Sequence, residues 1–401
     1  MLAVNRVVHL ECNVALEGVS INDLLARLRK GVGESFREAV QDFLAVLQEE
    51  HLERVLAGEA ELVCTGCGEV HRGAGVVRRG WRRRAVVGLE GRLRFALRQV
   101  TCLSCQRTWS PYPELLGLAP RQRVLRELEE KLVGVVTQLS YRRTCRIAQQ
   151  WLGGSMSPPT LHARVQKRAA ALELTPQPDS SVIMADGTKV PAGSGAQGED
   201  LRASFQIGEP YMEYGRARRQ VRLVGLGIGL GSWSRALPAT LQPSLVVTDG
   251  EPSLRAHVRK HFPKARHQLC MWHVPYGLDW SMSQEKVKVP VRRMYQAIAS
   301  RILFDHRSVQ RKRIRYRRLV RRMARVSPTA HKQLAQAADL LFYDQASQER
   351  TTSLAERRMR ESNRRLENGS RWSPGGAFSI ALLALAQTHN PDDYARLWAV
   401  S

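Results

Sequence analysis

Two aspartates each follow a short apolar run rich in β-branched residues. Residues 245–248 lead to Asp249 and residues 181–185 lead to Asp186, and a glycine follows each aspartate. Such a run predicts a buried strand, which holds a carboxylate in a fixed place at its C-terminal end. Two neighbouring strands of this kind predict a metal site with two acidic ligands. Taken singly, each Asp–Gly pair is equally typical of an ordinary turn.

A third acid comes from a helical part of the chain. Phosphoryl transfer from a DNA backbone uses two divalent ions about 3.5–4 Å apart. Mg²⁺, or Mn²⁺ in its place, prefers carboxylate oxygens from separate elements. Glu356 lies on a helix predicted over about 352–367 and suits this role. Two plainer interpretations remain open: a capping box with Ser353 and a side-chain pair with Arg360.

Four of the seven cysteines form two C-x-x-C pairs: Cys64, Cys67, Cys102 and Cys105. Zn²⁺ takes four tetrahedral thiolates, and each pair offers two, so the pattern predicts structural zinc in a zinc ribbon. A redox pair and an iron–sulfur site are the alternatives. His71 is a candidate substitute ligand. The arginines around Trp81 indicate contact with phosphates.

The charge of the chain indicates a polyanionic partner. The 401 residues include 62 Lys and Arg against 37 Asp and Glu, which gives a net charge of +25. This excess favours nucleic acid as the partner. There is no run of 18 apolar residues and no secretory signal, so we expect no membrane association and a cytoplasmic, nucleoid-associated protein.

Residues 120–175 fit a helix-turn-helix. An amphipathic helix begins near Leu125, a second helix covers about 143–152, and a glycine turn follows. Ser157 and Pro158 then predict the cap and first position of another helix. That helix would lie in a major groove, although two packed helices joined by glycine look similar. The residues expected to reach bases or phosphates are Thr160, His162, Arg164 and Lys167.

Residues 180–283 alternate strands and helices, and residues 284–349 read as helical. The first part predicts strands over 181–189, 201–208 and 219–228, a strand ending at Asp249, a helix over 251–262 and a strand over 267–273. This order is typical of a mixed α/β domain. The helical part contains Arg311, Arg313 and Arg315, for which we expect contact with the DNA backbone; a solvated helix face is the alternative.

Three segments together resemble the DDE transposases of the Mutator-like insertion sequences. They are Val247-Thr248-Asp249-Gly250, Cys270-Met271-Trp272-His273 and Ser353-Leu354-Ala355-Glu356-Arg357-Arg358-Met359-Arg360. The resemblance covers about 181–390 and implies an RNase H-like catalytic domain interrupted by an all-helical insertion. The upstream zinc ribbon departs from the best-known members of that group.

The resemblance also implies roles for single residues. Asp186 and Asp249 would share metal ions and Glu356 would complete the second ion's site. Cys270 and His273 match a C-x-x-H pair that would support the active site, with a core strand pair as the alternative. Asn363 lies two turns after Glu356 on the same helix face and would approach the site or DNA.

The expected fold is α/β: an RNase H-like mixed sheet with an all-helical insertion, preceded by a helical arm, a zinc ribbon and a helix-turn-helix. The expected parts are the arm (1–60), the ribbon (61–115), the helix-turn-helix (120–175), the first catalytic part (180–283), the insertion (284–349) and the final catalytic helices (350–401). The expected activity is Mg²⁺-dependent cleavage at transposon ends and strand transfer to target DNA. The partners would be double-stranded DNA and further copies of the chain, as a homodimer or larger assembly. A DNA-binding regulator without catalysis and an RNase H-like nuclease are the alternatives.

Overall fold

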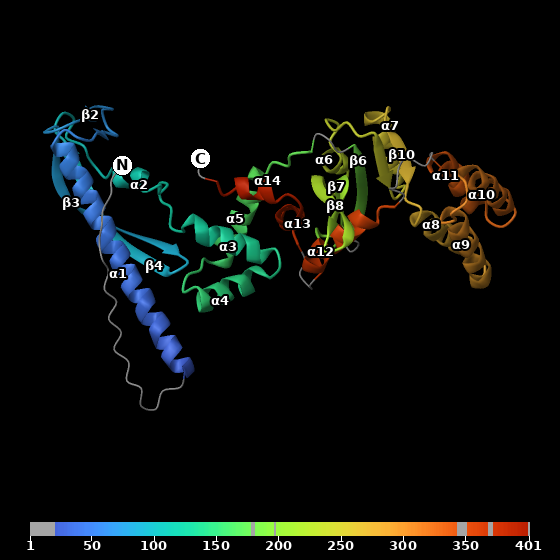
Figure 1. Ribbon diagram of the computed structural model, residues 1–401, viewed down its shortest axis with the longest axis horizontal. Helices are drawn as coiled ribbons and strands as arrows, with labels where there is room; N and C mark the ends of the chain where they lie inside the picture. Colours follow the sequence, from blue (N-terminus) through green and yellow to red (C-terminus); the bar gives the residue numbers. More distant parts are fainter. Residues whose placement is uncertain (1–20, 178–180, 196–197, 343–350, 368–371, 400–401) are drawn as a thin grey trace. The chain divides into compact units, whose positions relative to one another are not determined.

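The computed structural model describes residues 21–177, 181–195, 198–342, 351–367 and 372–399 (Figure 1). Residues 1–20 of the predicted arm and 343–349 of the predicted insertion lie outside these ranges. The chain divides into two compact units, Met1–Leu161 and His162–Ser401. The sequence indicated a boundary at 175–179 instead. Thr175 and Gln177 belong with the second unit because both are hydrogen-bonded to it.

The first unit is built on one long helix and a long hairpin. Helix α1 (Ile21–Leu56) packs along strand β4 (Gly91–Cys102), which pairs with β3 (Val76–Gly88). The Gln48 side chain donates to the Ala96 carbonyl and accepts from the Arg98 N–H, so the helix is tied to the strand backbone. Short strands complete the unit's β-structure: β1 (Leu62–Val63) pairs with β2 (Val70–His71), and β5 (Thr108–Trp109) pairs with β4.

Four helices follow the strands of the first unit. They are α2 (Tyr112–Leu115), α3 (Arg126–Val136), α4 (Tyr141–Trp151) and α5 (Pro158–Ala171), the last of which continues into the second unit. The predicted cap of α5 is confirmed, because Oγ of Ser157 accepts the N–H of Thr160 at 3.3 Å. Cys145 on α4 is buried.

The second unit contains a five-stranded mixed sheet in the order β10-β9-β6-β7-β8. Its strands are β6 (Val182–Val190), β7 (Glu199–Glu213), β8 (Arg216–Ile228), β9 (Leu245–Thr248) and β10 (Arg266–Leu269). The first three are antiparallel neighbours, whereas β9 runs parallel to both β6 and β10. The mixed α/β class predicted from the sequence is therefore compatible with the structure.

Helices cover both faces of this sheet. Ile183, Ala185 and Val246 pack on one face with α6 (Trp233–Ala236) and α7 (Pro252–His261). Alternate residues of a strand point to opposite faces, so Met184 and Asp186 point to the other face. There α12 (Ser353–Leu366) contacts β6 and β7, and α13 (Pro374–His389) contacts β8.

A helical segment leaves the sheet after β10. It contains α8 (His273–Gln284), α9 (Val289–Leu303), α10 (Val309–Met323), α11 (Pro328–Ala337) and the 3₁₀ turn Ala338–Leu340. These helices share one hydrophobic core, which includes Leu278, Ile302, Tyr316 and Leu334. The prediction of a strand over 267–273 is therefore wrong at its end: β10 stops at Leu269 and His273 begins α8. Pro275 is tolerated in a first helical turn but not in a central strand.

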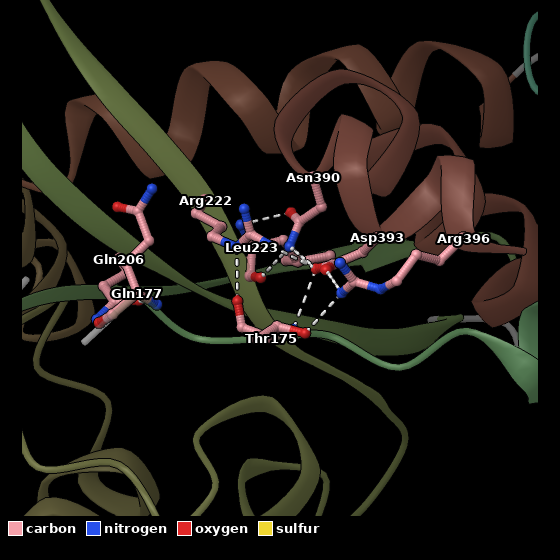
Figure 2. A network of polar contacts seen from close by, with 8 residues as sticks. All are labelled: Thr175, Gln177, Gln206, Arg222, Leu223, Asn390, Asp393 and Arg396. Atoms are coloured by element: carbon pink, nitrogen blue, oxygen red, sulfur yellow. Dashed lines mark hydrogen bonds and ion pairs between the residues drawn. The ribbon is translucent and has the colours of Figure 1, made fainter.

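A polar network joins the C-terminal helices to the sheet (Figure 2). The side-chain amide of Asn390 pairs with both the N–H and the carbonyl of Leu223 on β8, each at 3.0 Å. Asp393, on α14 (Pro391–Arg396), forms a buried ion pair with Arg222 at 2.8 Å. The same carboxylate accepts the N–H of Thr175 at 3.0 Å. These contacts fix α14 and residues 175–177 against the edge strand.

Candidate active site

Asp186 and Asp249 lie at equivalent positions on two adjacent parallel strands. The register pairs Ala185 of β6 with Thr248 of β9, so each aspartate is the next residue along its chain. Only 5% of Asp186 is exposed to solvent. One carboxylate oxygen of Asp249 accepts the N–H of Glu251 at 3.0 Å, which fixes its orientation at the start of α7. The two strands thus present two carboxylates side by side.

The two aspartates interact electrostatically. Burial and the nearby Asp249 carboxylate raise the pKa of Asp186 to about 7, with a smaller upward contribution from Glu356 and an opposing one from His273. Burial also raises the pKa of Asp249, against the hydrogen bond from the N–H of Glu251. Charged carboxylates that are buried together disfavour one another. A divalent cation would relieve this repulsion, so the donor set fits Mg²⁺ or Mn²⁺.

Glu356 lies on the first turns of α12 and is oriented by its own helix and by α8. The hydroxyl of Thr352 donates to Oε1 of Glu356 at 3.0 Å. Nε2 of His273 lies 3.7 Å from the same oxygen. The residue that precedes α12 is Thr352 rather than Ser353, and its side chain binds the carboxylate instead of the helix backbone. No local signal in the sequence marks Thr352 for this role.

Cys270 and His273 form a polar pair next to Glu356. The hydrogen bond to Cys270 raises the pKa of His273 to about 9, against burial and with help from Asp186 and Glu356. Burial alone would raise the pKa of Cys270, but hydrogen bonds from His273 and Thr352 lower it. Sγ of Cys270, a ring nitrogen of His273 and a carboxylate oxygen of Glu356 lie within 4.8 Å of one another. The structure thus brings the predicted C-x-x-H pair to the predicted glutamate.

Asn363 also reaches the strand that carries Asp186. Its side-chain nitrogen donates to the hydroxyl of Thr188 on β6 at 2.9 Å. Thr188 is two residues after Asp186 and points to the same face of the sheet. Among the described residues, the side-chain oxygen of Asn363 is buried without a hydrogen-bond partner. Asn363 therefore anchors α12 to β6 close to the acidic residues.

The four cysteines of the two C-x-x-C pairs come together at one end of the first unit. Their sulfur atoms lie within 4.8 Å of one another: Cys64, Cys67, Cys102 and Cys105. Each knuckle also directs a backbone N–H at a sulfur, from Gly66 to Cys64 at 3.3 Å and from Cys105 to Cys102 at 3.4 Å. Although burial opposes it, hydrogen bonding from the backbone of Cys67 and Gly66 lowers the pKa of Cys64 to about 7. These features fit thiolate ligands of a zinc ion.

The residues predicted to bind DNA lie on two helices. On α5, three of them are exposed and one is half-buried: Thr160, His162 and Lys167 are exposed, and Arg164 is half-buried. The hydroxyl of Thr160 forms a hydrogen bond with the hydroxyl of Ser157 at 2.8 Å. Arg311 is exposed on α10. Two other predicted contacts on α10 have protein partners: Arg313 donates to the Phe342 carbonyl, and Arg315 pairs with Asp305 at 2.5 Å. Further exposed arginines on α10 are Arg317, Arg318, Arg321 and Arg322.

A family model described as MULE transposase domain matches residues 228–275, which contain Asp249, Cys270 and His273. This match supports a Mutator-like transposase. No curated protein matches the chain. Within the ranges that the structure describes, no helix combines the length and apolar character needed to cross a membrane.

Proposed function

We propose that this protein is a DDE transposase, which cuts DNA at transposon ends and joins them to target DNA. The observation that carries the proposal is that two acids from other elements lie close enough to Asp186 to affect its ionisation. Asp186, Asp249 and Glu356 come from β6, the end of β9 and α12, and both other acids raise the pKa of Asp186. The match to the MULE transposase domain supports the same conclusion. The strand order of the sheet supports an RNase H-like catalytic domain.

Asp186, Asp249 and Glu356 would together hold two Mg²⁺ ions. When bound, such ions activate the attacking oxygen and stabilise the leaving oxygen of a phosphoryl transfer. Burial of Asp186 fixes its carboxylate and keeps bulk water from it. Thr352, which precedes α12, and His273, which begins α8, both hold the carboxylate of Glu356 in place. Asn363 holds α12 against β6, so the distance between the acids is set by packing.

The rest of the chain would deliver DNA to these acids. The Cys₄ cluster would hold structural zinc and stabilise the ends of the arginine-rich β3–β4 hairpin. Helix α5 would read a DNA groove, and the exposed arginines of α10 would contact phosphates. Lys and Arg exceed Asp and Glu by 25 residues, which supports double-stranded DNA as the substrate.

The test uses the full-length protein with DNA that contains the terminal repeats flanking its gene. We expect Mg²⁺-dependent nicking at the repeat end and, with a target plasmid, joined products. Asp186→Asn should abolish both while DNA binding persists. Binding without any cleavage by the wild type would favour a DNA-binding regulator. Hydrolysed ends without joined strands would favour an RNase H-like nuclease.

A further inference from the structure

Helix α8 and the residue that caps its start carry a row of exposed aromatic side chains on their outward side. Trp272, Tyr276 and Trp280 are 48%, 61% and 64% exposed, and we call them the α8 aromatic row. They are spaced four residues apart, which places them along one side of the helix with a rise of about 6 Å between neighbours. The opposite side of α8 packs into the core of the helical segment through Val274, Leu278 and Met282, among others.

This face departs from the usual pattern of an amphipathic helix. Outward faces of such helices normally carry charged and polar side chains, and single exposed apolar residues need no explanation. Three aromatic residues in line do need one. Trp272 is held in place, because its ring packs against that of Phe304 with centroids 4.6 Å apart. Trp272 is therefore the fixed end of the row.

The row begins at the candidate active site. Trp272 directly precedes His273, whose Nε2 lies 3.7 Å from Oε1 of Glu356. The two helices α8 and α9 are basic overall: residues 273–303 contain five Lys and Arg against two acids. One of those acids, Asp279, is paired with Arg292 at 3.7 Å. A ligand on this face would meet aromatic rings, positive charge and the carboxylates of the site.

We infer that the α8 aromatic row binds unpaired bases of the DNA strand next to the point of cleavage. Aromatic side chains stack on bases of any sequence, and basic residues beside them attract the phosphates. A DNA strand that is opened or released at the cleavage point exposes its base faces, which a duplex hides. The inference rests on the proposed function, since it places this strand at the site formed by Asp186, Asp249 and Glu356.

The experiment measures binding of the full-length protein, without divalent ions, to two labelled oligonucleotides of equal length. One is oligodeoxythymidine and the other is an abasic strand with the same number of phosphates. The wild type should bind the first more tightly. Because stacking contributes about 1–3 kcal/mol per base, Trp280→Ala should weaken oligodeoxythymidine binding about 5- to 140-fold. Binding of the abasic strand should stay unchanged.

Two further variants define the effect. Trp280→Phe keeps an aromatic face and should restore most of the lost affinity. Tyr214→Ala removes an exposed tyrosine from the β7–β8 turn and should change neither affinity. Equal affinity of the wild type for both strands would overturn the inference, as would equal weakening of both by Trp280→Ala. A change of oligomeric state in Trp280→Ala, with unchanged oligonucleotide binding, would assign the row to a protein contact and also overturn it.

The outcome is separable from that of the proposed function. Glu356→Gln should abolish cleavage of terminal-repeat DNA but keep the preference for oligodeoxythymidine. Cleavage by the wild type without a base-dependent preference would refute only the role of the aromatic row. A base-dependent preference in a wild type that never cleaves DNA would refute only the transposase.

Discussion

The backbone N–H of Thr352 donates a 3.3 Å hydrogen bond to Sγ of Cys270, a residue 82 positions earlier in the chain. This contact joins the segment between β10 and α8 to the start of α12. The hydroxyl of the same threonine donates to Glu356. The C-x-x-H pair therefore helps to position the glutamate, because Cys270 binds the residue that precedes its helix and His273 lies next to its carboxylate.

Thr352→Val tests this positioning. The variant keeps the shape and backbone of Thr352 but removes the hydroxyl that binds Glu356. Residues that orient a metal ligand contribute about 10- to 100-fold in metal affinity or activity. We expect a loss of that size in cleavage at low Mg²⁺ and partial recovery at high Mg²⁺. Thr351→Val is the control, because its hydroxyl binds Ser353 instead. An equal effect of both variants would contradict the positioning role.

The pKa of Asp186 predicts how pH acts on the metal-free protein. This pKa is about 7 in the folded chain, against about 3.9 for an exposed aspartate. The folded state therefore holds a proton that the unfolded state releases. The stability that protonated Asp186 contributes is complete below about pH 4 and is lost as the pH rises to about 7.

Asp186→Asn isolates this effect. Asparagine resembles the neutral acid, so variant and wild type should unfold at similar denaturant concentrations near pH 5. At pH 8 the variant should be more stable than the wild type, because it avoids the buried charge. Mg²⁺ should make the wild type more stable than the variant at pH 8, because it binds the ionised carboxylate of Asp186. A difference in stability that is the same at both pH values would show that Asp186 does not titrate in this range.

The buried pair Arg222–Asp393 predicts a large stability effect (Figure 2). Asp393→Ala leaves the buried guanidinium without its main partner, which typically costs about 3–5 kcal/mol. We expect a correspondingly lower urea midpoint for the second unit. Asp392→Ala is a matched control, since this neighbouring acid is exposed. Similar midpoints for the two variants would mean that the network contributes little to stability.

Replacement of a single knuckle cysteine tests the zinc ribbon. Cys64→Ser should release zinc and unfold the β1–β5 region, while the second unit keeps its unfolding transition. Zinc content measured by elemental analysis should fall from one ion per chain to none. Cys145→Ala, which removes a cysteine outside the cluster, should retain the metal. A wild type without zinc would refute this prediction.

Arg311→Ala tests the basic face of α10. A phosphate contact carries no sequence information, so the variant should weaken binding uniformly across DNA sequences. The slope of log affinity against log salt should decrease by about one. Arg235→Ala, at an exposed position on α6, is the comparison. A loss confined to one DNA sequence would indicate a base contact instead.

The sequence predicted the elements with strong local patterns. The apolar runs before Asp186 and Asp249 predicted β6 and β9, and Ser157 followed by Pro158 predicted the start of α5, where Ser157 accepts the N–H of Thr160. The predicted end of the strand at residue 273 was wrong, because a short apolar run fits either a strand or a helix. Pro275 was the local signal for α8 that the prediction overlooked.

Contacts between distant residues could not be predicted. Neither Thr352 nor Asn390 belongs to a motif, and their partners Cys270 and Leu223 lie far away in the sequence. The bond from Arg313 to the carbonyl of Phe342, 29 positions later, likewise depends on tertiary packing. Periodicity shows which face of a helix is buried but not which residue it meets. The sequence alone does not identify the α8 aromatic row, because only the structure shows that the opposite face of the helix is buried.

The central claim is that Asp186, Asp249 and Glu356 share one pair of metal ions. The most direct test replaces Mg²⁺ with Fe²⁺ and uses ascorbate and peroxide to break the polypeptide next to the bound iron. The account predicts three sets of breaks, near residues 186, 249 and 356, and their joint loss in Asp186→Asn. Breaks near only one or two of these positions, or breaks that persist in the variant, would contradict it.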